Sequence, residues 1–337
     1  MAKSKTLAAA LKSQQSRLHN KQKEKERAAA QSAELASRKQ SANGLGSSSK
    51  GKAKQQPPPL PRPTIPFRAT DKILLIGEGN FSFARALVCD PPSDALRHLP
   101  PRNVTATAYD TEDECYAKYP EAEAIVRALR DAGAEVLFGV DATRLERVSA
   151  FKGRRWDKVV WNFPHAGKGI ADQDRNILSN QLLILGFLRS AAGFLAKGPI
   201  PNVMASSKKR KRVDEDRDAD AEDDADSDLD DAAPASPETA SERGRILITL
   251  RNVVPYTQWD VPRLAKHPPA PTSASAPENP SYILLRSYAF QRNLWTGYEH
   301  RMTKGERANG AGKTGEGGED RTWEFCLGRV AVDREKR

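Results

Sequence analysis

The amino-acid sequence predicts an α/β fold with a mainly parallel sheet, and three observations support this fold class. Short apolar runs alternate with helix-forming segments at the spacing of strand–helix–strand units. The first run, residues 72–76, is apolar at almost every position, as in strands buried on both faces of a sheet. Four runs end in a glycine, an aspartate or an asparagine, which places polar groups where open parallel sheets bind ligands.

Composition limits the classes of protein to consider. The chain has 337 residues, a net charge of +10 and 38% hydrophobic residues, so part of it is not expected to join a core. No run of about 18 apolar residues occurs and the charged N-terminus lacks an apolar signal core, which argues against a membrane span and against secretion. Three widely spaced cysteines without a CxxC pair argue against a disulfide framework and a metal site.

The N-terminal segment, residues 1–66, is expected to be a disordered basic tail. Residues 1–55 hold 13 Lys and Arg against 3 Glu, a net charge of +10, and the segment ends in a proline-rich run. Such an arm binds polyanions through phosphate contacts that release counterions. A solubilising or targeting tail is the alternative interpretation.

The first strand–helix–strand unit follows this tail. Lys72–Ile76 is a short apolar run stopped by Gly77, which is typical of a buried parallel strand. Phe81–Val88 then predicts a helix. Val104–Tyr109 alternates and is β-branched, which predicts a second strand that ends at Asp110. The two polar strand ends are expected to lie at the same edge of the sheet.

Two more strands follow in the same rhythm. The alanine-rich segment Glu121–Ala132 predicts a helix, stopped by a glycine. Glu135–Val140 predicts the third strand, which ends at Asp141. Asp157–Trp161 predicts the fourth strand. A long helix is expected from an N-cap at Asp172 to Gly198, and a fifth strand over Arg245–Leu250.

A charged insert, residues 199–243, interrupts the rhythm between the long helix and the fifth strand. Residues 214–231 hold twelve acidic side chains in eighteen positions, which repel one another and predict a disordered, solvated loop. The basic run Lys208–Arg212 fits a nuclear import signal, and with it an import receptor as a partner. Ser227 lies among aspartates and is a candidate for phosphorylation.

The C-terminal part of the chain has a strand pattern. Ser281–Phe290 and Arg321–Leu327 alternate apolar and polar residues, and the glycine-rich segment Gly305–Asp320 lies between them. We expect these two strands to form an antiparallel hairpin at the edge of the sheet, which brings the total to seven strands. Residues 333–337 are expected to be a short tail.

The ends of the first three strands predict a nucleoside-type cofactor. Gly77 and Gly79 allow a tight turn and the approach of a ligand to bare backbone. A dinucleotide fingerprint requires a third glycine where Ser82 stands, which argues against a nicotinamide cofactor. Asp110 suits two ribose hydroxyls and Asp141 an adenine amino group, although a helix N-cap is the alternative role for either one. Together the three ends favour S-adenosylmethionine (SAM).

The end of the fourth strand indicates the reaction. Asn162, Phe163, Pro164 and His165 resemble the Asn-Pro-Pro-aromatic tetrapeptide of methyltransferases that act on planar nitrogens. The proline makes the turn rigid, the Asn amide can hold an N–H group, and the aromatic ring can stack on a base. His165 can accept a ring proton near neutral pH, whereas a plain turn is the structural alternative.

Several motifs together resemble the large-subunit (25S) ribosomal RNA uridine-N3 methyltransferase family of fungi and its eukaryotic relatives. GEGNFSF and NFPHxG are the most specific of them. In order, the matching segments are Lys72–Leu87, Ala108–Asp110, Lys118–Pro120, Gly139–Thr143, Trp161–Gly167, Ile246–Leu250, Pro255–Trp259 and Gly297–Thr303. The chain departs from the family at Trp161, where a smaller aliphatic residue or Phe is more usual, and at the insert.

The resemblance implies a Rossmann-like, SAM-dependent methyltransferase domain over residues 67–332, interrupted by the insert. It implies methylation of N3 of a uridine in large-subunit ribosomal RNA or the pre-ribosome, in the nucleus and nucleolus. The sulfonium of SAM needs no metal for this reaction, and we expect the chain to be a monomer. The cofactor residues that it implies are Gly77, Glu78, Gly79, Asn80 and Phe81 at the methionine and ribose end, Asp110 at the ribose, and Asp141 and Ala142 at the adenine. Asn162, Phe163, Pro164 and His165 are implied at the target base.

Three alternatives remain open at the level of sequence. The enzyme can act on another RNA or another position, or the chain can be a non-catalytic ribosome-assembly factor with the same fold. An NAD-type oxidoreductase is the third, against which the missing glycine and the NFPH sequence argue. In the methyltransferase interpretation the uridine is flipped out of its stack, and N3 loses its proton to His165 or to water.

Overall fold

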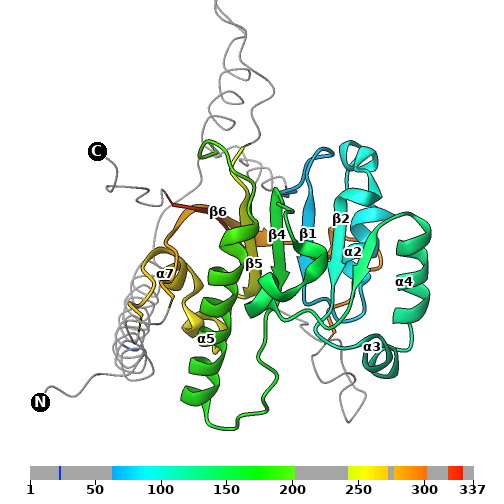
Figure 1. The fold of residues 1–337 in the computed structure, drawn as a ribbon. Helices are drawn as coiled ribbons and strands as arrows, with labels where there is room; N and C mark the ends of the chain where they lie inside the picture. Colours follow the sequence, from blue (N-terminus) through cyan, green and yellow to red (C-terminus); the bar gives the residue numbers. More distant parts are fainter. Residues whose placement is uncertain (1–22, 24–62, 202–241, 272–276, 302–317, 329–337) are drawn as a thin grey trace, which may run out of the picture.

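The computed structural model describes residue 23 and residues 63–201, 242–271, 277–301 and 318–328. Most of the predicted basic tail, the acidic run, Lys208–Arg212 and Ser227 lie outside the described residues, as do residues 333–337. The described parts form three layers, a central sheet with helices on both faces (Figure 1).

The sheet has seven strands in the order β3-β2-β1-β4-β5-β7-β6. The first five strands in this order are parallel, and β7 pairs antiparallel with both β5 and β6. This arrangement confirms the predicted fold class, including the C-terminal antiparallel hairpin at the sheet edge. The strands are β1 (Ile73–Ile76), β2 (Val104–Thr107), β3 (Glu135–Leu137), β4 (Lys158–Asn162), β5 (Arg245–Arg251), β6 (Tyr282–Phe290) and β7 (Asp320–Leu327).

Five α-helices of the described ranges cover the sheet. They are α2 (Ser82–Val88), α3 (Glu112–Lys118), α4 (Ala122–Asp131), α5 (Gln173–Ala191) and α7 (Val261–Lys266). Short 3₁₀ helices lie at Asp94–His98, Pro101–Asn103, Ala142–Arg147, Ser149–Phe151, Ala192–Phe194, Tyr256–Trp259 and Arg292–Leu294.

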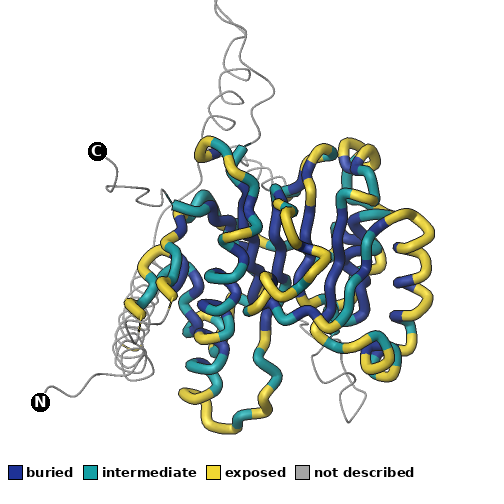
Figure 2. The backbone as a smooth tube through the Cα atoms, in the orientation of Figure 1, coloured by how far each residue is buried: buried dark blue, intermediate teal, exposed yellow. Residues whose placement is uncertain are grey.

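Alternate residues of the strands face two separate cores, as the period of a strand requires. Ile73 and Leu75 of β1 face the core that α2 and α4 cover, whereas Leu74 and Ile76 face the core under α5 and α7. Buried backbone accordingly fills the middle of the molecule, and exposed backbone follows the outer sides of the helices (Figure 2).

The long helix α5 belongs to a core. The helical segment Gln173–Phe194 is, within the described ranges, long and apolar enough to pass a membrane-span test of length and composition. Its residues Ile177, Ile184 and Phe187 are nevertheless buried against the strands. We therefore assign it as the core helix of an α/β domain.

The element ends differ from the sequence prediction in three places. The helix α3 was not predicted, although Thr111 and Glu114 form a reciprocal capping box at its start. Strands β2 and β3 end at Thr107 and Leu137, earlier than predicted. The long helix ends before Gly198, because the Trp156 N–H donates to the Phe194 carbonyl and the Ala196 N–H donates to the Trp156 carbonyl.

A buried ion-pair network joins the strands near the amino ends of β4 and β5. The carboxylate of Glu324 on β7 accepts hydrogen bonds from Lys158 at 3.2 Å, Arg245 at 2.8 Å and Arg286 at 2.5 Å. Burial raises the pKa of Glu324, but the three cations outweigh this effect and hold it below its usual value.

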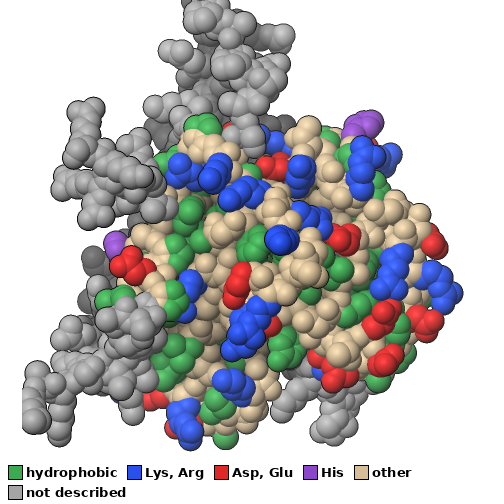
Figure 3. All heavy atoms as spheres, in the orientation of Figure 1, with side chains coloured by type: hydrophobic (Ala, Val, Ile, Leu, Met, Phe, Trp, Pro, Cys, Tyr) green, Lys and Arg blue, Asp and Glu red, His purple; other side chains and the backbone are tan. Residues whose placement is uncertain are grey.

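In the view of Figure 3, Lys and Arg side chains gather along the upper edge and acidic ones near α3 and α4.

Candidate active site

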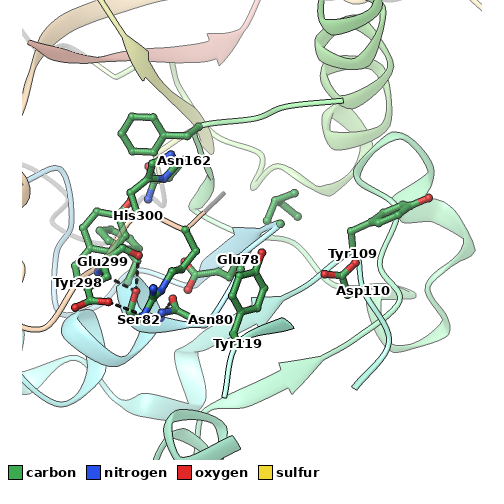
Figure 4. A pocket seen from close by; sticks show the side chains of 16 residues that line it. Glu78, Asn80, Ser82, Tyr109, Asp110, Tyr119, Asn162, Tyr298, Glu299 and His300 are labelled. Carbon is green, nitrogen blue, oxygen red and sulfur yellow. Dashed lines mark hydrogen bonds and ion pairs between the residues drawn. The ribbon is translucent and has the colours of Figure 1, made fainter. Parts of the chain in front are cut away.

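A cleft opens at the carboxyl ends of β1, β2 and β4, where an open parallel sheet is expected to bind ligands. The space between its walls, with the open solvent at the mouth included, is about 700 Å³. Figure 4 shows Asn162 and His300 toward one end of the cleft and Asp110 toward the other. The lining residues are Ile76, Gly77, Glu78, Gly79, Asn80, Ser82, Phe83, Tyr109, Asp110, Tyr119, Asn162, Phe163, Tyr298, Glu299, His300 and Arg301.

The turn after β1 requires glycine at position 77 and leaves little room for a side chain at position 79. Gly77 has a φ of +63°, and a Cβ there would lie 2.8 Å from the Nε1 atom of Trp161. A Cβ on Gly79 would lie 3.3 Å from the Cβ of Arg301 and 3.4 Å from the ring of Tyr119. Trp161, the departure noted in the sequence, therefore packs against the glycine turn, and both glycines leave bare backbone toward the cleft.

Glu78 is half-buried and places a carboxyl group in the cleft. Its Oε2 atom accepts a hydrogen bond of 3.1 Å from the Ala84 N–H in the first turn of α2. Burial raises the pKa of Glu78 to about 7, and the Ala84 N–H opposes this only in part. Among the described residues, no Lys, Arg or His forms an ion pair with Glu78. The cleft thus holds a carboxyl group that lacks a cation from these parts of the chain.

The segment Tyr298–Arg301 forms the opposite wall and is tied to the glycine turn. The hydroxyl of Ser82 donates to the carbonyl of Glu299 at 3.0 Å and accepts from its N–H at 3.1 Å. Arg301 bridges Glu121 and Glu299, each at 2.8 Å. Asn80 donates to Glu121 at 2.8 Å. These bonds hold residues more than 200 positions apart in sequence on two sides of one cleft.

Asp110 lines the cleft, as its position after the second strand predicted. Its Oδ1 atom accepts from the Lys118 ammonium group at 2.6 Å, so Lys118 holds the carboxylate in place. The neighbouring Tyr109 is 71% exposed at the mouth of the cleft. Its ring, like that of Tyr119, offers an aromatic surface to a bound ligand.

Three cofactor residues implied by the resemblance do not line this cleft. Asp141 caps the 3₁₀ helix that follows it, accepting from the Thr143 N–H at 2.8 Å and the Thr143 hydroxyl at 2.7 Å. Ala142 is buried beside it. Phe81 is fully buried with a φ of 62°, and its ring lies 5.3 Å from that of Phe138. Phe81 therefore packs in the core under α2 and α4 and supports the glycine turn from the side of that core.

The predicted base-binding tetrapeptide divides into two pairs. Asn162 and Phe163 line the cleft, and Phe163 adopts a φ of +53° while its N–H donates to the Thr249 carbonyl at 2.8 Å. Pro164 is buried and His165 is exposed, and neither lines the cleft. The Nδ1 atom of His165 accepts from the Gly167 N–H at 2.9 Å.

The histidine that does line the cleft is His300, which sequence reasoning did not select. Its ring centroid lies 4.4 Å from that of Phe163, and the guanidinium carbon of Arg292 lies 4.7 Å from the same Phe163 ring. Burial, with the charges of Arg292 and Arg251 added to it, lowers the pKa of His300 to about 4. The motif Gly297–Thr303 carried the family resemblance but indicated no chemistry, so this role was missed.

The donor set fits SAM better than a metal ion. Three features suit a ligand that carries positive charge and ribose hydroxyls: a carboxyl group with no ion-pair partner among the described residues, glycine backbone, and an acceptor at Asp110. Within the described ranges, no three His, Cys, Asp or Glu side chains are grouped so that they would hold a metal ion.

Comparison with known proteins gives concordant matches. Residues 74–302 match the model of the BMT5-like family, described as rRNA (uridine-N3-)-methyltransferase BTM5-like. The chain is 27% identical over 263 residues to the 25S rRNA (uridine(2634)-N(3))-methyltransferase of Saccharomyces cerevisiae, which covers 72% of this chain and 69% of the yeast protein.

Two other relatives share a smaller part of their length. The heavy metal-associated isoprenylated plant protein 41 of Arabidopsis thaliana is 25% identical over 268 residues, 79% of this chain and 39% of the plant protein. The ferredoxin-fold anticodon-binding domain-containing protein 1 homolog of Mus musculus is 36% identical over 126 residues, 37% of this chain and 18% of the mouse protein. The family model matches more than half of this chain. The chain therefore belongs to the BMT5-like family of SAM-dependent rRNA (uridine-N3)-methyltransferases, as its motifs predicted.

Proposed function

We propose that this chain transfers a methyl group from SAM to N3 of a uridine in large-subunit ribosomal RNA, in the cleft described above. The observation that carries the proposal is that one cleft joins the glycine turn and Asp110 to Asn162 and Phe163. A cofactor end and a base end therefore lie within reach of one another, as methyl transfer requires. The activity for which the yeast relative is named supports 25S rRNA as the substrate.

The cofactor end holds the nucleoside and methionine portions. The backbone at Gly77 and Gly79 allows the cofactor to approach closely. The carboxylate of Asp110 accepts hydrogen bonds from the ribose hydroxyls, either beside its bond from Lys118 or in place of it. Glu78 supplies negative charge beside the positively charged part of the cofactor. Asn80 and Phe81 hold the shape of the turn, and Asp141 and Ala142 are proposed at the adenine.

The base end orients a flipped uracil. SAM supplies an electrophilic methyl group when it is bound. Asn162 orients the imide, Phe163 stacks on the ring, and Pro164 keeps the turn rigid. The N3–H proton leaves to water or, through water, to His165, which does not itself line the cleft. The new N3–carbon bond replaces the sulfur–carbon bond, whose electron pair stays on the sulfur. Alignment of N3 with the methyl group is the main source of acceleration.

The RNA is held outside the cleft as well. The basic tail carries the same net charge as the whole chain, so it is proposed to contact ribosomal RNA phosphates, and Lys208–Arg212 to direct import into the nucleus and so to the nucleolus. Deletion of residues 1–55 is expected to weaken RNA binding and to flatten its salt dependence while SAM affinity stays the same. Unchanged RNA affinity would assign the tail to targeting.

The decisive experiment maps modified nucleosides in large-subunit ribosomal RNA. RNA from a strain that lacks the enzyme is expected to lose one N3-methyluridine, which purified enzyme and SAM restore. Asn162→Ala and His165→Ala are expected to reduce this activity, and full activity of both variants would show that the base site lies elsewhere. Calorimetry that detects no SAM binding would favour the assembly-factor alternative.

A further inference from the structure

The base end of the cleft contains a histidine to which neither the sequence nor the family resemblance gives a role. His300 lines the cleft together with Asn162 and Phe163, and its ring centroid lies 4.4 Å from that of Phe163. The two rings are inclined at 46° rather than stacked face to face. A base stacked parallel to Phe163 would therefore be inclined to the imidazole by the same angle.

The surroundings of His300 keep its imidazole uncharged at neutral pH. It is largely buried, and the cations Arg292 and Arg251 act on it from the 3₁₀ helix after β6 and from the end of β5. Arg292 is itself held by Asp320 at 2.6 Å. Burial and these charges together lower the pKa of His300 to about 4, so the neutral form predominates between pH 5 and 8.

A neutral imidazole has the properties that this reaction requires at that position. Loss of the N3 proton spreads negative charge onto the two uracil carbonyl oxygens beside N3, and an N–H donor aimed at such an oxygen stabilises it. A positively charged imidazolium would instead repel the sulfonium of the cofactor. Neutral histidines serve as donors to carbonyl oxygens in other enzymes for a similar reason.

We propose that His300 contacts the target uracil, donating its imidazole N–H to a carbonyl oxygen beside N3 and so orienting N3 toward the methyl group. This inference rests on the proposed function. The imidazole N–H of His300 bonds to the carbonyl oxygen and not to N3, so the path between N3 and the methyl group stays free. A contact with the O4 oxygen also favours uracil over cytosine, which has an amino group at that position and shares only the O2 oxygen.

The test uses the full-length protein, large-subunit ribosomal RNA from a strain that lacks the enzyme, and SAM. Two variants separate the donor from the space it fills: His300→Gln keeps a side-chain N–H, whereas His300→Phe keeps an aromatic ring without a polar donor. His98→Ala is the matched control, because His98 is exposed and does not line the cleft.

We expect His300→Phe to lower kcat about 100-fold with the Kd for SAM changed less than about twofold, since one donor to developing charge is lost. His300→Gln is expected to recover about tenfold of that loss, and His98→Ala to match the unaltered protein. The SAM titration also reports whether each variant is folded.

Three results would overturn the proposal. The first is wild-type kcat in His300→Phe, and the second is an equal loss in both His300 variants. The third is a loss of SAM affinity that parallels the loss of activity, which would assign His300 to the cofactor wall. Absence of methylation by the unaltered protein is a different outcome, because it would overturn the proposed function itself.

Discussion

Two glutamates at opposite edges of the sheet, Glu324 buried and Glu78 half-buried, have opposite surroundings. Glu324, toward the amino ends of β4 and β5, is bonded to three cations, Lys158, Arg245 and Arg286. Glu78, at the carboxyl end of β1, receives one backbone N–H and no cation from the described residues. The pKa is correspondingly lowered at Glu324 and raised at Glu78. The charge of Glu324 is compensated inside the sheet, whereas the charge of Glu78 has no compensating cation among the described residues at the place where a cationic ligand is proposed to bind.

Backbone conformation shows the same difference. Phe81 and Phe163, both beside the cleft, adopt positive φ angles that cost a side chain about 1–2 kcal/mol. Around Glu324, β4, β5 and β7 pair in regular registers from Lys158↔Arg245 to Leu247↔Glu324, whereas β6 and β7 shift register between Leu284 and Arg286. The positive φ angles at Phe81 and Phe163 therefore distinguish the carboxyl edge, where they aim groups at the cleft.

The largest effect on stability is expected from removal of the negative charge of Glu324. Glu324→Gln leaves Lys158 and Arg286 without their carboxylate partner and Arg245 with Glu242 alone, so the free energy of unfolding is expected to fall by about 3–5 kcal/mol. Urea denaturation measures this change. A loss below about 1 kcal/mol would mean that the network is not a source of stability.

Removal of the negative charge of Glu78 is expected to raise the stability of the protein, the opposite of the effect at Glu324. The pKa of Glu78 in the folded chain is about 7, above its usual value of 4.5, so the folded state loses stability as pH rises from about 4.5 to 7. Glu78→Gln removes this dependence and is expected to stabilise the protein by roughly 2–3 kcal/mol at pH 8, with no gain at pH 4.

The same Glu78→Gln variant is expected to bind SAM about tenfold more weakly at pH 8, because the negative charge beside the cofactor is lost. Denaturation at pH 4 and 8 and calorimetry with SAM measure the two effects. An equal change in stability at both pH values would contradict the assignment of the raised pKa.

The glycine turn provides a smaller effect with a matched control. Gly77→Ala combines a positive φ with a contact to Trp161, and a loss of stability of about 2 kcal/mol is expected. Gly153 also has a positive φ, but a Cβ added there would meet no atom of the described residues within 4 Å, so Gly153→Ala is expected to cost only about 1 kcal/mol. Equal losses would show that strain alone, without Trp161, requires the glycine.

The smallest effect is expected at the ribose position. Asp110→Asn keeps the shape of the side chain but removes its charge, so the Kd for SAM is expected to rise about tenfold, or about 1.4 kcal/mol. Asp113→Asn is the control, because Asp113 is exposed on α3 and does not line the cleft. Calorimetry measures both, and an unchanged Kd for Asp110→Asn would remove Asp110 from the cofactor site.

Local patterns predicted the elements well where one short segment carried the information. The apolar run before Gly77 and the strand before Asn162 were placed to within a residue or two, because burial on both faces leaves a clear signal. The helix α3 was missed although Thr111 and Glu114 form its capping box, since its exposed sequence lacks a long apolar stripe. The long helix ended early because Trp156 pairs with the chain after it, a contact that local periodicity does not encode.

The sequence by itself determined the fold class, the family and the strand ends that bear Gly77, Asp110 and Asn162, because each depends on residues close together in the chain. Only the tertiary structure decided that His300 lines the cleft and that His165 and Asp141 do not. It also decided that Glu78 lacks a cation among the described residues while Glu324 has three. The physical reason is that burial and electrostatic potential are sums over neighbours from distant segments, which folding alone brings together.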